Sequence, residues 1–86
     1  LTAHDATVLA EILKSNTSVT GVYLQSNKEI GDEGAKALAE ALKVNTTVKM
    51  LHLHNCGIGE QGAQLLRDAV AGRQGFTLNT SSFNYN

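Results

Sequence analysis

The 86-residue chain contains no tryptophan or proline, one cysteine, one methionine, two tyrosines and two phenylalanines. A hydrophobic core must therefore be built from leucine, valine, isoleucine and alanine. One cysteine cannot form an internal disulfide, and the cysteine and histidines lack the spacing of a structural zinc site. We therefore expect no disulfide-stapled secreted mini-protein, no metal site and no cofactor.

Charge of one sign is also missing, since seven lysines and arginines face eight aspartates and glutamates, for a formal net charge of −1. Proteins that bind nucleic acid or anionic membranes usually carry a basic excess, so neither partner is expected. No apolar run approaches the roughly 20 residues of a membrane span, and the first residues lack the order of a signal peptide. The sequence predicts a cytoplasmic protein.

Internal repetition is the main feature of the sequence. The run LAEILKSNTSVT at residues 9–20 returns as LAEALKVNTTVK at 38–49, an offset of 29, and IGDEGA at 30–35 returns as IGEQGA at 58–63, an offset of 28. We interpret the chain as one domain, residues 1–86, with units at 1–29, 30–57 and 58–82 and a C-terminal cap to residue 86.

Each unit combines a helical and a strand periodicity. Ala35, Leu38 and Leu42 mark one face of a helix, and Thr2-x-x-Asp5 predicts a capping box at the start of the first helix. Gly31 and Gly59 mark the matching helix starts, and the apolar spacing returns at Ala6, Leu9 and Leu13 and at Ala63, Leu66 and Val70.

A turn and a short strand follow each helix. At Asn16 and Asn45 we expect turns, at which asparagine tolerates left-handed dihedrals. Beyond them, apolar and polar residues alternate in Val22-x-Leu24 and Leu51-x-Leu53, which predicts half-buried strands.

The run Leu51-His-Leu53-His-Asn-Cys56-Gly-Ile58 resembles the leucine-rich-repeat pattern L-x-L-x-x-[N/C]-x-[L/I], and Val22-Tyr-Leu24-Gln-Ser-Asn27 resembles its first six positions. The period, with a helix in every unit, resembles the ribonuclease-inhibitor-like subfamily of nucleotide-binding immune receptors, Ran GTPase-activating protein and tropomodulin. The resemblance implies an α/β solenoid of about three β-α units, with a short parallel sheet on the concave side and helices on the convex side.

The resemblance also implies roles for individual residues. Leu24, Leu53 and Leu78 should stack into one core, and the side chains of Asn27, Cys56 and Ser81 should turn inward. The third unit is degraded, and we interpret residues 71–86 as a C-terminal cap in which Phe76, Phe83 and Tyr85 cover the open end.

The candidates for chemistry are few. His52 and His54 lie two apart on a strand and should share a face, where they are surface residues, partner contacts or, least favoured, two ligands of an incomplete metal site. No nucleophile, acid–base pair or phosphate loop is evident, so no enzyme is expected. Of the N-x-S/T triplets at Asn16, Asn45 and Asn79, the first two recur at repeat turns, which favours a structural role over glycosylation.

The leading functional hypothesis is a non-catalytic module that binds a protein partner through the concave strand face. The outward positions with side chains are Tyr23, Gln25, Met50, His52, His54, Thr77 and Asn79. The alternatives are a terminal fragment of a larger receptor or GTPase regulator, as a chain that begins in mid-repeat suggests, or a tropomodulin-like cytoskeletal cap. The first helix has no preceding unit to cover it, and the first strand has an open edge. Both features also predict self-association through the N-terminal end, in the form of a homodimer.

Overall fold

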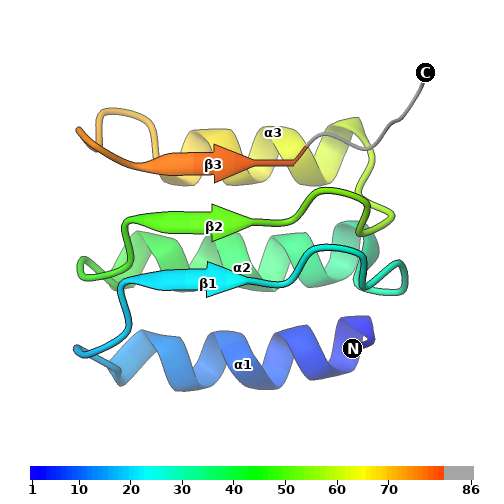
Figure 1. Ribbon diagram of the computed structural model, residues 1–86, viewed down its shortest axis with the longest axis horizontal. Coiled ribbons are helices and arrows are strands. Elements are labelled where there is room, and N and C mark those ends of the chain that lie inside the picture. Colours follow the sequence, from blue (N-terminus) through cyan, green and yellow to red (C-terminus); the bar gives the residue numbers. More distant parts are fainter. Residues whose placement is uncertain (81–86) are drawn as a thin grey trace.

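The computed structural model describes residues 1–80 and has two layers (Figure 1), with the helices side by side behind the strands. The strands form one parallel sheet in the order β1-β2-β3. This arrangement confirms the predicted α/β fold of three β-α units. The elements are α1 (Ala3–Ser15), β1 (Gly21–Tyr23), α2 (Gly31–Val44), β2 (Met50–His52), α3 (Glu60–Ala69) and β3 (Thr77–Asn79).

Two of the helix starts are held by carboxylates. Thr2 and Asp5 form the predicted capping box at α1. At α3 the cap comes from the neighbouring helix, because Oδ1 of Asp32 in α2 accepts hydrogen bonds from the backbone N–H groups of Gly59 at 2.7 Å and Gly62 at 3.2 Å. An acceptor at a helix N-terminus satisfies donors that have no partner within the helix. Asp32 therefore joins α2 to α3 as well as capping α3.

One continuous core lies between the two layers. Leu51 and Leu53 of the central unit are almost fully buried, with 1% and 0% of their surface exposed, and Leu38 and Leu66 close the core from the helices. The inward turn of Cys56 is confirmed, since its thiol is buried and donates to the carbonyl of Leu24 at 3.0 Å. The other fully buried large side chains are Ile30 and Val48.

The third unit enters the sheet in a different register from the predicted one. Leu78 pairs with Leu51, not with Leu53, so the expected stack of Leu24, Leu53 and Leu78 is wrong. The cause is the preceding segment: α3 has 10 residues against 14 in α2, and Val70 caps its end instead of continuing the helix. Phe76 lies half-buried before the strand, under the Arg73 guanidinium at 4.9 Å. Ser81, Phe83 and Tyr85 of the expected cap lie outside the described residues.

The helix-to-strand turns depend on asparagine side chains, not on left-handed backbone. Asn16 and Asn45 end α1 and α2 with φ values of −84° and −78° and extended ψ, so neither uses the left-handed dihedrals that asparagine tolerates. Instead, Asn45 Oδ1 accepts from the N–H groups of Thr47 and Val48, and its Nδ2 donates to the carbonyls of Leu13 and Asn16. The buried Asn45 amide thus closes its own turn and ties it to the preceding one.

Arg73 performs the same bridging task in the third unit. Its guanidinium donates to the carbonyl of Leu42 at 3.1 Å and to that of Val48 at 2.6 Å. Leu42 occupies in the second unit the place of Leu13 in the first. Because a guanidinium has only donors, it can replace the amide N–H groups of asparagine but not the acceptor oxygen.

Replacing Leu53 by alanine tests the strand register. Leu53 is fully buried at the centre of the array, so Leu53→Ala should lower the free energy of unfolding by about 2–5 kcal/mol. His52→Ala, one residue away on the outward face, should cost less than about 1 kcal/mol. Urea denaturation followed by circular dichroism compares the two, and equal losses would contradict the register.

A second pair of variants tests the asparagine turns. Asn45→Ala leaves buried carbonyl and N–H groups of two turns without partners, and should lower the free energy of unfolding by about 2 kcal/mol or more. The matched control is Asn16→Ala, at the same place in the first unit, where the side-chain oxygen accepts only from Ser18 and Val19. A cost at Asn16 equal to that at Asn45 would contradict the bridging role of Asn45.

Candidate protein-interaction surface

The outward residues of the three strands form one surface, which we call the strand face. It comprises the predicted residues Tyr23, Met50, His52, Thr77 and Asn79 of the strands and, just beyond β1 and β2, the predicted Gln25 and His54. The register places Tyr23, His52 and Asn79 in one row, and Met50 beside Thr77 in the row before it. These positions alternate with the inward Val22, Leu51 and Leu78. The structure therefore brings residues from all three units onto one side of the sheet.

Tyr23, on the edge strand β1, contacts two other residues of the strand face. Its ring stacks on that of His52, with the ring centroids 5.0 Å apart and the planes at 24°, and its hydroxyl donates to Met50 Sδ at 2.8 Å. Tyr23 nevertheless keeps 59% of its surface exposed. A large aromatic side chain that is held in place yet exposed loses little conformational entropy when a partner covers it.

His54 differs from His52 in its surroundings. Its Nδ1 atom is buried and has no hydrogen-bond partner, although the side chain as a whole is half-buried. Cys56 does not approach the histidine rings, because its thiol points to the carbonyls of Leu24 and His54, and burial raises the pKa of that thiol. Within residues 1–80 no three His, Cys, Asp or Glu side chains are grouped so that they could hold a metal ion.

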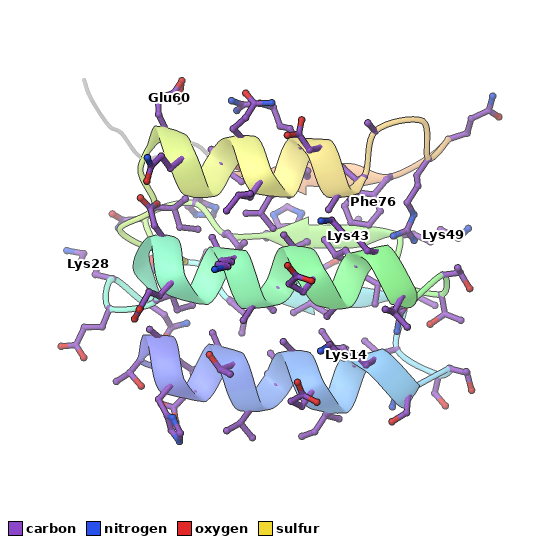
Figure 2. All side chains as sticks on the ribbon, turned by 180° about the vertical axis from the view of Figure 1, so that it is seen from behind. Lys14, Lys28, Lys43, Lys49, Glu60 and Phe76 are labelled. Atoms are coloured by element: carbon purple, nitrogen blue, oxygen red, sulfur yellow. The ribbon has the colours of Figure 1, made fainter. Side chains whose placement is uncertain are left out.

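The strand face has no lysine, arginine, aspartate or glutamate, and the charged residues lie around it. Figure 2, seen from behind, shows Lys14, Lys43 and Lys49 toward one end of the units and Lys28 and Glu60 toward the other. The helices explain part of this separation. Asp5 of α1 and Asp32 and Glu33 of α2 occupy first turns, and Lys14 and Lys43 occupy last turns, as the helix dipole favours. A partner would therefore meet a neutral, polar and aromatic centre.

An open pocket of about 830 Å³ extends the strand face beyond the last strand. Three residues of the strand face line it, namely His52, Thr77 and Asn79. The apolar part of the wall comes from Ile58 and Leu78. The charged Glu60 and Arg67 of α3 form the remaining side. The sequence patterns did not indicate Glu60 or Arg67, because both occupy exposed helix positions that look like ordinary solvated surface. The pocket therefore places two charged side chains of opposite sign next to the strand face.

A stack of similar β-α units that share one parallel sheet is the architecture of a repeat protein that presents a binding surface. The chain belongs to the leucine-rich-repeat family, whose model matches residues 15–39 and 44–66. Leucine-rich repeats generally serve as protein-interaction modules. No helix within residues 1–80 has the length and apolar character needed to cross a membrane.

Curated relatives place these repeats within much longer proteins. The chain is 46% identical over 48 residues to the centrosomal protein of 78 kDa from Xenopus tropicalis, covering 56% of the chain and 7% of the relative. It is 34% identical over 65 residues to the Cep78 homolog of Drosophila melanogaster, covering 76% and 7%. Rat NACHT, LRR and PYD domains-containing protein 3 is 39% identical over 59 residues, covering 67% and 6%. The chain thus spans less than a tenth of these relatives.

Proposed function

We propose that the chain is a non-catalytic, cytoplasmic module of the ribonuclease-inhibitor-like subfamily that binds a protein partner through the strand face. A helix of at least 10 residues in every unit supports the subfamily assignment. Residues 1–86 then act as one domain, with no metal or cofactor and no nucleic-acid or membrane partner. The name of the centrosomal relatives supports a cytoplasmic site of action.

The stacked Tyr23–His52 pair is the observation that carries this proposal. The Tyr23 side chain is exposed and His52 is half-buried, the two rings stack on each other, the Tyr23 hydroxyl also contacts Met50, and neither ring belongs to the hydrophobic core. Tyrosine, methionine and other apolar or aromatic groups are enriched where proteins bind each other, and charged side chains are depleted at the centre of such surfaces. The strand face has this composition, whereas the helix face is rich in lysine and glutamate.

The strand-face proposal is tested with Tyr23, Met50, His52 and His54 all replaced by alanine. This variant should fold, because none of the four side chains belongs to the core, but should lose its partner. The control replaces the exposed Glu33, Lys36, Glu40 and Gln64 of the helix face. Both variants and the wild type are immobilised, exposed to one lysate, and the captured proteins compared by mass spectrometry. Capture retained by the first variant and lost by the control would contradict the proposal.

A second hypothesis is that the chain is part of a longer protein, such as a receptor, a GTPase regulator or a cytoskeletal cap, and that other parts of this protein carry the biological activity. It is favoured by the small share of each relative that the chain covers. In that case the strand face still binds a protein, but the bound protein controls or positions an activity carried elsewhere. Deleting these units from the longer protein would then abolish its localisation or control and leave its chemistry intact.

Homodimerisation through the N-terminal end is the second candidate interaction. Leu1, Val8 and Ile12 are exposed there by 52%, 48% and 56%, and the outer edge of β1 has no paired strand among the described residues. Two such ends related by a twofold axis would cover each other.

The dimer is tested by light scattering after size exclusion at about 0.1 mM, where weak self-association is populated by mass action. The wild type should be a dimer and Ile12→Asp a monomer. Val44→Asp is the matched control, because Val44 is equally exposed, at 58%, but lies at the end of α2. A folded wild-type monomer would contradict dimerisation.

A further inference from the structure

Very small residues lie at the contacts between neighbouring helices. A Cβ atom at Gly34 of α2 would overlap Ile30 and lie 3.1 Å from Ala6 Cβ of α1. At Gly62 of α3, a Cβ would lie 3.0 Å from Ala35 Cβ of α2. The same flank of α2 continues with the fully buried Ala41. Each helix therefore approaches the preceding one over a glycine that leaves no room for a side chain.

The first helix lacks this small flank. Ala6, Leu9 and Leu13 of α1 match Ala35, Leu38 and Leu42 of α2 at an offset of 29, so the alignment of the two helices is fixed by their core residues. At the same offset, the small residues of α2 are replaced by larger ones in α1. Asp5 stands in place of Gly34, Val8 in place of Ala37, and Ile12 in place of Ala41.

The orientation of these three residues agrees with that comparison. Val8 and Ile12 are half exposed, whereas Ala41, the counterpart of Ile12 in α2, is fully buried. Asp5 has a task of its own, since its carboxylate accepts from the Thr2 backbone N–H at 3.0 Å. This hydrogen bond is the main reason that the pKa of the Asp5 carboxyl is lowered, so the group is ionised at neutral pH. Enclosing an ionised carboxylate in an apolar joint without a charged partner is strongly unfavourable.

We infer that Asp5, Val8 and Ile12 form an end stop, a helix flank that prevents another unit of this chain's kind from packing on α1 as α1 packs on α2. The steric hindrance comes from these three side chains, because the corresponding positions at the contact between α1 and α2 are glycine and alanine. The electrostatic part comes from the Asp5 carboxylate. The flank still accepts partners that approach at a greater distance, such as a helix with its own large side chains.

The end stop has a consequence for self-association. The opposite end of the array keeps Ala63, the counterpart of Ala6 and Ala35, next to Ile58 and Gly59. Docking this end of one copy onto α1 of another would be a head-to-tail contact, which repeats without closing and produces filaments. Asp5 would face Ala63 in that contact, and the long Arg67 side chain, which stands in place of Ala10 and Ala39, would keep the two helices too far apart for an internal type of contact.

The end stop is tested by placing a copy of residues 30–57 directly before Leu1 of the full chain. The junction then repeats the natural order, with glycine followed by the first apolar residue of a unit. With native α1, amide hydrogens in the added helix should exchange as in an unfolded peptide. With Asp5→Gly, Val8→Ala and Ile12→Ala together, they should become protected by about tenfold or more. The control is the triple variant without the added unit.

Two results of this experiment would overturn the inference. One is protection of the added helix on native α1. The other is an unprotected added helix on a substituted α1 that itself remains protected.

Loss of the capping box makes Asp5→Gly a risk to the folding of α1, so a reverse experiment accompanies it. Gly34→Asp places the same carboxylate in the internal joint of the unmodified chain. It should release α1 from protection while α2 and α3 keep theirs. Lys36→Asp, which adds a carboxylate at an exposed position of α2, is the matched control. Unchanged protection of α1 in Gly34→Asp would overturn the inference.

Discussion

Close contact between neighbouring helices is the constraint on which the rest of the structure depends. Parallel strands pair about 4.8 Å apart, whereas packed helices usually lie about 8–10 Å apart. Every strand can therefore keep its helix behind it over three units only if neighbouring helices pack unusually close to each other or the sheet curves away from the helices. Gly34 and Gly62 allow the near approach, because a Cβ atom there would lie only 3.1 and 3.0 Å from an alanine Cβ of the preceding helix. The remaining mismatch favours a strand face on the inner side of the curve.

The first two units could be predicted from sequence, because the helical spacing, the turn residues and the strand alternation all indicate the same fold. Leucines at helical spacing, asparagine at the turn and alternating residues in the strand recur at an offset of 29 in units one and two. The third unit could not be predicted in detail. Phe76 and Leu78 both fit an alternating strand, and only the length of α3 and the hydrogen bonds of Arg73 decide between registers. Contacts between units, such as Asp32 with Gly59, leave no local sequence pattern.

The strand face was found from the alternation of residues alone, since every second residue of a half-buried strand must point outward. What alternation could not supply is how those residues interact. The Tyr23–His52 stack depends on the pairing of β1 with β2 in register, which is a property of two units and not of either sequence segment. The neighbouring pocket, with Glu60 and Arg67, likewise arises where α3 and β3 come together.

The residues that stabilise the fold and the residues that a partner can contact lie on different sides of the sheet or in the turns. Asn45, Cys56 and Leu53 hold turns and core, and replacing them alters every contact around them. Tyr23, Met50 and His52 touch mainly one another, so they can vary together without disturbing the core. The flank of α1 shows a third situation, in which positions reserved for glycine and alanine inside the array carry Asp5, Val8 and Ile12 instead. A repeat position keeps its small residue only where a neighbouring helix must pass close to it, and where that requirement is absent the same position becomes a surface that selects what can approach.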